Sequence, residues 1–242
     1  MKNVITYENL RSFTYSNDHL IEGEIQGIVI FFTGLGCQGM YENEEPFHGR
    51  YLAERGIVWL MPYSDPWNWM NRRTVSFVDE LVDVLVKHYG LSDNLPIVST
   101  GDSMGGLCSL TYMAYAKRTP AACVANCPVC DLVYHFTERP DLPRTIYSAY
   151  GDMEGTLEEV LSTGSPYHLM AEGKMPCVPY HLFHCEADDA VNIDRHSRRF
   201  VQVAEGKVPV TLYAIPGRGH CDLGQENHEK FLAVSVEAIL GK

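Results

Sequence analysis

The sequence predicts an α/β fold in which a mostly parallel central sheet has helices on both faces. Short runs of β-branched and aromatic residues recur along the chain, as is typical of strands that are buried on both faces. Segments with apolar residues at helical spacing fill most of the intervals between these runs. Alternating strands and helices favour parallel strands joined by crossover helices. A sharp glycine–serine–glycine turn between one such strand and a helix agrees with this architecture.

Six apolar runs predict the strands of the sheet. They span residues 27–33, 57–61, 97–100, 122–125, 178–183 and 210–215. Two segments show the clearest helical spacing, and both predict amphipathic helices that cover the sheet. Their apolar positions are Val75, Val78, Leu81, Val82 and Leu85 in the first segment, and Phe231, Val234, Val236 and Leu240 in the closing one.

The chain is expected to form a single domain over residues 1–242. No linker rich in proline, glycine or serine divides it, and 45% of its residues are apolar. Residues 132–174 are too long for an ordinary connection, and they contain two proline-bearing turns and a short polar helix near residues 157–161. Because this insertion follows a core strand, we expect a small helical cap over the carboxyl ends of the strands. The alternative is a peripheral helical excursion.

Charge and cysteine content limit the function. The chain has 19 basic and 31 acidic residues, a net charge of −12, and no basic cluster, which argues against nucleic-acid and anionic-membrane partners. No segment has the length of a secretory signal core or a membrane span, so a cytoplasmic location is expected. Eight cysteines fit that compartment as reduced thiols. Cys127-Pro-Val-Cys130 has no second C-x-x-C to complete a metal site, so we expect neither metal nor cofactor.

The most informative motif is Gly101-Asp-Ser103-Met-Gly105, directly after the run at residues 97–100. A strand that turns sharply into a helix strains the residue at its apex, and glycines two places to either side leave room for that turn. The hydroxyl of Ser103 then projects into solvent as a candidate nucleophile. A serine hydroxyl is weakly nucleophilic at neutral pH, so a base and a group that orients the base are required further along the chain.

With this motif, an acidic loop after residues 180–185 and a Gly217-Arg-Gly-His220 turn, the chain resembles the α/β-hydrolases from about residue 27 to residue 240. The family order of serine, acid and histidine implies that Ser103 attacks a carbonyl, His220 transfers the proton and Asp188 orients the imidazole. Asp188 matches the family habit of an acid followed three residues later by valine. Asp189 and Asp131 remain alternative acids.

The resemblance also implies an oxyanion hole made of two backbone N–H groups. One belongs to Met104, the residue after the nucleophile. The other belongs to Leu35, because Thr33-Gly-Leu35-Gly stands where the family has His-Gly-x-Gly. Thr33 replaces the usual histidine, which changes local hydrogen bonding but leaves the backbone donors in place. A plain tight turn is the alternative interpretation of this loop.

Aromatic residues near the predicted active-site edge are candidate substrate-binding groups. Trp67 and Trp69 follow the run at residues 57–61, and Tyr41 follows the oxyanion loop. They suit an apolar or aromatic acyl or alcohol group, although the two tryptophans could instead anchor their loop to the core.

Within the family, the carboxyl-terminal part resembles the catalytic domain of prolyl-oligopeptidase-like proteins. The first strand-like run already begins at Gly27, so no β-propeller is expected before it. A carboxylesterase that acts on a small-molecule ester through an acyl-enzyme, such as an acetyl or feruloyl esterase, is the leading hypothesis, and it rests on analogy for its substrate. The alternatives are a small peptidase or amidase, and a binding protein that has lost turnover.

Overall fold

The computed structural model describes residues 4–37 and 45–241. Its centre is a seven-stranded sheet with the strand order β1-β3-β2-β4-β5-β6-β7. The six predicted runs form β2 to β7, which pair in parallel, so the predicted fold class is confirmed. Their bounds are Gly27–Phe32, Ile57–Pro62, Ile97–Asp102, Ala122–Asn126, Tyr180–Cys185 and Val210–Ile215.

One strand was absent from the predictions. β1, Thr14–Ser16, pairs antiparallel with β3 at the edge of the sheet. All three of its residues are buried, so neither an alternating pattern nor a long apolar run marks it. Two short 3₁₀ helices, Tyr7–Ser12 and Asp18–Leu20, flank this strand.

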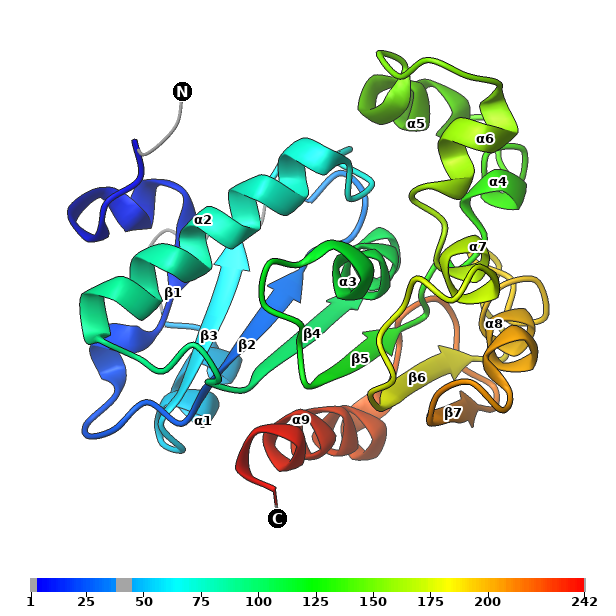
Figure 1. The fold of residues 1–242 in the computed structure, drawn as a ribbon. Coiled ribbons are helices and arrows are strands. Elements are labelled where there is room, and N and C mark those ends of the chain that lie inside the picture. The colour runs from blue at the N-terminus through cyan, green and yellow to red at the C-terminus, as the bar shows by residue number, and fades with distance from the viewer. Residues whose placement is uncertain (1–3, 38–44, 242) are drawn as a thin grey trace.

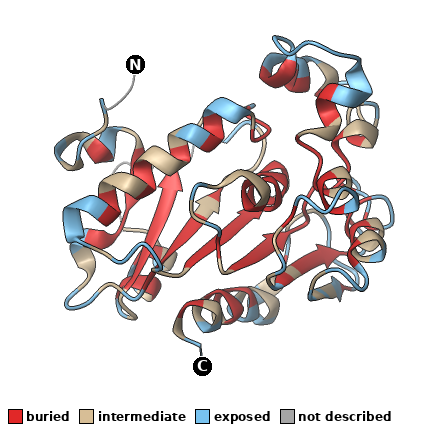
Figure 2. Ribbon diagram, in the orientation of Figure 1, coloured by how far each residue is buried: buried red, intermediate tan, exposed pale blue. Residues whose placement is uncertain are grey.

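Helices cover both faces of the sheet, and the alternation of side chains along β2 shows the division. Ile28 and Ile30 belong to the same apolar cluster as α2 (Arg72–Tyr89) and the start of α3 (Met104–Tyr115). Val29 instead packs in the cluster that contains apolar side chains of α1 (Phe47–Ala53) and α9 (Gly224–Leu240). Successive side chains of a strand point to opposite faces. Strands β2 to β6 are buried almost throughout (Figure 2), whereas β7 at the edge of the sheet is mostly intermediate or exposed.

Five of the predicted helical positions confirm the first amphipathic helix: Val75, Val78, Leu81, Val82 and Leu85 are all buried in α2. The closing helix is confirmed as α9, where Phe231 and Val234 are buried, while Val236 and Leu240 are only partly buried. A further helix, α8 (Ser197–Ala204), lies beside β7 and the short α7.

The insertion between β5 and β6 contains more structure than the single short helix that was expected. Its helices are α4 (Leu132–His135), α5 (Leu142–Tyr150), α6 (Leu157–Ser162) and α7 (Pro166–Ala171). Pro143 and Pro166 lie in the first turns of α5 and α7, where proline is tolerated because the first N–H groups of a helix have no partner within it. Helices α4, α5 and α6 lie beyond the arrowheads of β4 and β5 (Figure 1).

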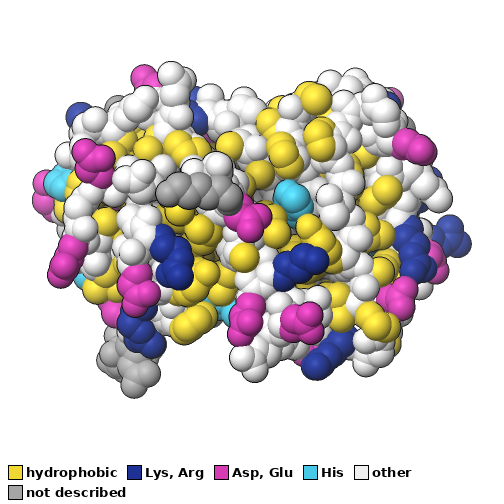
Figure 3. Space-filling view, turned by 90° about the horizontal axis from the view of Figure 1, so that it is seen from below, with side chains coloured by type: hydrophobic (Ala, Val, Ile, Leu, Met, Phe, Trp, Pro, Cys, Tyr) yellow, Lys and Arg dark blue, Asp and Glu magenta, His cyan; other side chains and the backbone are white. Residues whose placement is uncertain are grey.

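The charged side chains on the face that contains α9 are of both signs. In Figure 3, Lys and Arg side chains are interspersed with Asp and Glu side chains among apolar atoms. Among the residues described, no helix combines the length and the hydrophobicity that a membrane crossing requires.

Candidate active site

The turn between β4 and α3 has the strained geometry that its sequence predicts. Ser103 has φ 60° and ψ −119°, a conformation that costs a non-glycine residue free energy and is retained where the surroundings enforce it. A Cβ atom on Gly101 would overlap the carbonyl of Gly105, and a Cβ atom on Gly105 would overlap the carbonyl of Phe32. Both glycines are therefore required for the close packing of β2, β4 and the start of α3.

Ser103, His220 and Asp188 form one continuous chain of hydrogen bonds. The Ser103 hydroxyl lies 2.8 Å from His220 Nε2, and His220 Nδ1 lies 2.6 Å from Asp188 Oδ2. The other carboxylate oxygen, Asp188 Oδ1, accepts the backbone N–H groups of Ala190 and Val191, each at 2.9 Å. Asp188 follows the end of β6 and His220 follows the end of β7. Neighbouring parallel strands thus bring residues far apart in sequence to one edge of the sheet.

The two alternative acids have other environments. Asp189 is exposed, and its neighbour Asp188 makes the hydrogen bond to His220. Asp131 accepts the N–H of Tyr134 at the start of α4 and forms an ion pair with Arg199 at 2.7 Å. These contacts give Asp131 the role of a helix cap.

Burial and hydrogen bonding shift the pKa in opposite directions for each of Asp188 and His220. Burial disfavours the Asp188 carboxylate, but hydrogen bonds from His220 and from the backbone of Val191 outweigh it, so the pKa of Asp188 is lowered. Burial likewise disfavours the His220 imidazolium, but the hydrogen bond to Asp188, with a smaller contribution from Cys127, raises the pKa of His220 to about 9. The site therefore stabilises the ion pair that forms when His220 takes a proton.

This raised pKa leads to an expected pH dependence. His220 accepts the Ser103 proton only when it is neutral, so kcat/KM for an ester should fall as the pH drops below the pKa of His220. We expect the midpoint of this acid limb well above the 6.5 of an ordinary histidine. A kcat/KM profile between about pH 5 and pH 10 measures it. An acid limb of kcat/KM with its midpoint at or below pH 6.5 would contradict the raised pKa of His220.

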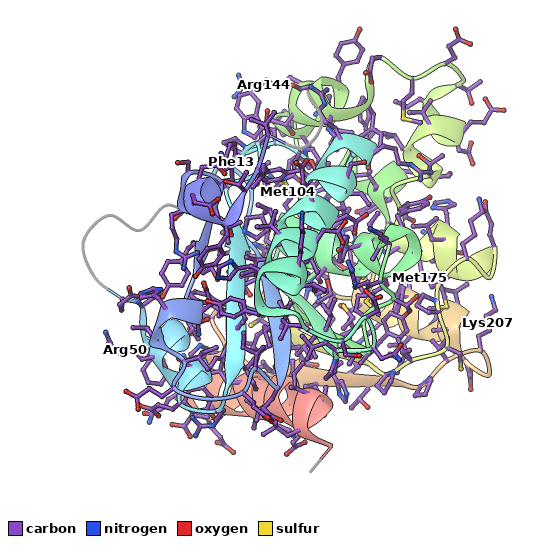
Figure 4. The ribbon with its side chains drawn as sticks, turned by 60° about the vertical axis from the view of Figure 1, so that its left-hand side comes forward. Phe13, Arg50, Met104, Arg144, Met175 and Lys207 are labelled. Carbon is purple, nitrogen blue, oxygen red and sulfur yellow. The ribbon has the colours of Figure 1, made fainter. Side chains whose placement is uncertain are left out.

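The two candidate oxyanion donors are available for a ligand. Neither the N–H of Leu35 nor that of Met104 donates to an acceptor among the described residues. Met104 is the first residue of α3, and the first N–H groups of a helix have no partner within the helix. Figure 4 labels Met104, with Arg144 of α5 above it in that view. An oxygen anion at Ser103 would meet the positive end of the α3 dipole.

A cavity of about 410 Å³ opens beside Ser103. Its apolar walls come from Leu35, Trp69, Leu142 and Val191. The insertion between β5 and β6 also contributes His135 and Arg139, which together with Leu142 were not predicted individually. Their only sequence signal is their place in the insertion at residues 132–174, which was expected to lie over the site. The rest of the cavity lining consists of Gly34, Asp102, Ser103, His220 and Cys221.

The aromatic candidates for substrate binding separate into three cases. Trp69 is buried, lines the cavity and donates its Nε1–H to Thr145 of α5 at 3.2 Å, so it both anchors its loop and faces the site. Trp67 does not reach this cavity: 39% of it is exposed, and it lines a separate groove with Tyr63. Tyr41 lies outside the described residues.

Two buried clusters have metal-ligand spacing, but their hydrogen bonds occupy the histidines. In the cluster of His135, Glu138 and His196, Nδ1 of His196 accepts the backbone N–H groups of Cys130 and Asp131. Its Nε2 must then carry the proton, which it donates to Glu138 at 2.9 Å. In the cluster of Cys127, His184 and Asp188, Nε2 of His184 faces the carbonyl of Val191 at 2.9 Å and also carries a proton. A protonated nitrogen has no lone pair for a metal.

The fold and the Ser103–His220–Asp188 arrangement define the chain as an α/β-hydrolase. The model of the prolyl oligopeptidase family matches residues 66–236, which is more than half of the sequence. The chain belongs to the prolyl oligopeptidase family, a serine hydrolase family of esterases and peptidases. Among curated protein sequences, none matches this chain significantly.

Solved structures share the fold at low sequence identity. An S-formylglutathione hydrolase from Agrobacterium tumefaciens is 15% identical with a TM-score of 0.64, over 89% of this chain and 82% of that chain. The esterase Est2 from Thermogutta terrifontis is 18% identical with a TM-score of 0.64, over 94% and 86%. An acylaminoacyl peptidase from Pyrococcus horikoshii is 14% identical with a TM-score of 0.68, over 88% of this chain but only 37% of that chain. This chain therefore matches about a third of the peptidase.

Proposed function

We propose that this protein hydrolyses small carboxylic esters through an acyl-enzyme intermediate. The observation that supports the proposal best is the unbroken hydrogen-bond chain from Ser103 through His220 to Asp188 at the wall of a cavity. A hydroxyl activated by an oriented base is the arrangement that nucleophilic acyl transfer requires.

The proposed reaction has two halves. Ser103 Oγ attacks the ester carbonyl while His220 Nε2 takes its proton, and Asp188 stabilises the resulting imidazolium. His220 then gives that proton to the departing alcohol, and the acyl group stays on Ser103. In the second half, water attacks the acyl-enzyme with the same help from His220 and releases the carboxylic acid. The N–H groups of Leu35 and Met104 would hold the negative oxygen of both tetrahedral intermediates. Removal of one such donor typically costs about 3–4 kcal/mol of transition-state stabilisation.

The cavity supports a small substrate with an apolar part. Cap residues Leu142 and His135 close one side of it, and Trp69 supplies a buried aromatic wall. A volume of about 410 Å³ suits a compact acyl group or alcohol. The second candidate is cleavage of a small amide or peptide, which membership of a family of esterases and peptidases favours.

Hydrolysis of paired substrates tests the proposal. The esters are p-nitrophenyl acetate, butyrate and octanoate, and the amides are a set of aminoacyl p-nitroanilides, each assayed with the wild type and with Ser103→Ala. We expect ester turnover that depends on Ser103, with little cleavage of the anilides. Comparable cleavage of the anilides would favour the peptidase, and inactivity on both sets together with no labelling by a fluorophosphonate would favour a binding role.

We also propose that the protein works in the cytoplasm. All eight cysteines are free thiols, and most of them are buried. Free thiols are typical of proteins from reducing compartments, whereas secreted domains more often pair their cysteines.

A further inference from the structure

A third cluster with metal-ligand spacing lies within the candidate active site. It consists of Cys127, His220 and Cys221, whose ligand atoms all lie within 4.8 Å of one another. His220 differs here from His184 and His196 of the two other clusters. Its Nδ1–H donates to Asp188 at 2.6 Å, so in the neutral imidazole its Nε2 carries the lone pair. A carboxylate that holds the far nitrogen of a histidine is the usual support of a zinc-binding imidazole.

The separation of the ligand atoms fits tetrahedral zinc. Cys221 Sγ lies 3.6 Å from His220 Nε2. With Zn–S near 2.3 Å and Zn–N near 2.0–2.1 Å, a tetrahedral angle places sulfur and nitrogen about 3.6 Å apart. Thiolate and imidazole together are a ligand set that selects zinc over magnesium or calcium.

The backbone around Cys127 is arranged as it is around a metal-bound thiolate. Two N–H groups, those of Cys185 and Cys221, each lie 3.4 Å from Cys127 Sγ as donors. Hydrogen bonds to a ligand atom are the outer contacts that orient it and tune its affinity for a metal. The sulfur is buried, yet it is reached through Cys221 and His220, both of which line the cavity beside Ser103.

Both cysteines also have strained backbone conformations. Cys127 has φ 42° and Cys221 has φ 59°, in the left-handed region that residues other than glycine rarely adopt. Ser103, with φ 60°, is the third strained residue around His220. Strained residues of this kind concentrate at functional sites, where the surrounding structure holds a side chain in a required direction.

We propose that Cys127, Cys221 and His220 bind a zinc ion that reversibly inhibits the enzyme. The inference rests on the proposed function, because inhibition follows from the use of His220 as a base. Zinc would replace the thiol protons of Cys127 and Cys221, so two protons are released for each ion bound to a neutral His220. The ion would occupy the Nε2 lone pair that otherwise accepts the Ser103 proton. Water or the Ser103 hydroxyl would fill the fourth position.

Binding is tested first without a substrate. Cobalt(II) replaces zinc as the probe, because thiolate–cobalt charge transfer and tetrahedral ligand-field bands report on coordination by sulfur. The background protein is Cys37→Ser/Cys177→Ser, which lacks the two exposed thiols. We expect one cobalt ion per chain with a thiolate spectrum, displaced by zinc. Cys221→Ala should lose the spectrum, and Cys130→Ala, which removes the buried thiol of the same C-x-x-C motif outside the cluster, should keep it.

Inhibition is tested second, with a p-nitrophenyl ester. Zinc should inhibit the background protein and a chelator should restore its activity, whereas Cys221→Ala should need at least about tenfold more zinc for half inhibition. Cys127→Ser serves as a second ligand variant if Cys221→Ala fails to fold. Absence of a thiolate spectrum, or equal zinc sensitivity of Cys221→Ala and Cys130→Ala, would overturn the proposal. If the protein bound cobalt with a thiolate spectrum but did not hydrolyse esters, the metal site would stand and the esterase proposal would be rejected.

Discussion

Ser103→Ala is expected to reduce ester turnover by about 10⁴- to 10⁶-fold. The variant removes the atom that forms the acyl-enzyme, and the residual rate would come from binding and the oxyanion donors alone. Folding should be unaffected, because alanine keeps the Cβ atom at φ 60° and the lost hydrogen bond joins Ser103 only to His220. The measurements are kcat with p-nitrophenyl butyrate, labelling by a fluorophosphonate and the melting temperature.

A matched control is Ser148→Ala, on the exposed surface of α5. It should retain wild-type turnover and labelling. If Ser103→Ala kept activity within tenfold of the wild type, the proposed mechanism would be wrong, since no other step supplies the nucleophile.

Asp188→Asn is expected to lower kcat by about 10⁴-fold. The reason lies in the two backbone N–H groups that donate to Asp188 Oδ1. An asparagine must keep its carbonyl oxygen toward those donors, so its NH₂ group faces His220 Nδ1. Nδ1 then becomes an acceptor, the proton moves to Nε2, and His220 loses the lone pair that takes the Ser103 proton. The variant holds the wrong tautomer in an otherwise intact site.

Asp189→Asn is the matched control, since the neighbouring carboxylate is exposed. It should leave kcat within a few-fold of the wild type. Asp131→Asn should do the same at a small cost to stability, because asparagine can still cap α4 but loses the ion pair with Arg199. Suppose that Asp188→Asn kept near-full activity while Asp189→Asn or Asp131→Asn lost it. The catalytic acid would then be the residue whose variant was inactive.

Much of the fold follows from local patterns in the sequence. The runs that form β2 to β6 are mainly apolar and buried because both faces of the sheet are covered there, whereas β7 at the edge of the sheet is only partly buried. Helix α2 buries each of the five positions that its periodicity indicates. Ser103 and His220 each sit in a glycine-containing turn beside a strand. By contrast, α5 and α7 were obscured by prolines in their first turns, and β1 is too short to produce a period.

The loop that contains Trp67 and Trp69 shows where local sequence patterns no longer predict the direction of a side chain. Trp67 and Trp69 are two residues apart and chemically alike, yet only Trp69 lines the cavity. Positive φ angles of 42° at Trp69 and 52° at Met70 redirect the chain at this point, and both side chains are buried. The direction of the Trp69 ring depends on this turn and on Thr145 of α5, which accepts the Trp69 N–H.

The sequence by itself determined the layered α/β fold and the candidate nucleophile, because buried strands, covering helices and a strained serine turn each impose residue types at short range. The candidate base and three alternative acids followed from the resemblance to the α/β-hydrolases. Only the tertiary structure decided which side chains of the insertion line the cavity beside Ser103, and which acid bonds to His220. It also showed that the C-x-x-C cysteines diverge, since Cys127 meets Cys221 near His220 while Cys130 does not. Such encounters join residues that are distant in sequence, so they depend on strand order and loop direction rather than on any local pattern.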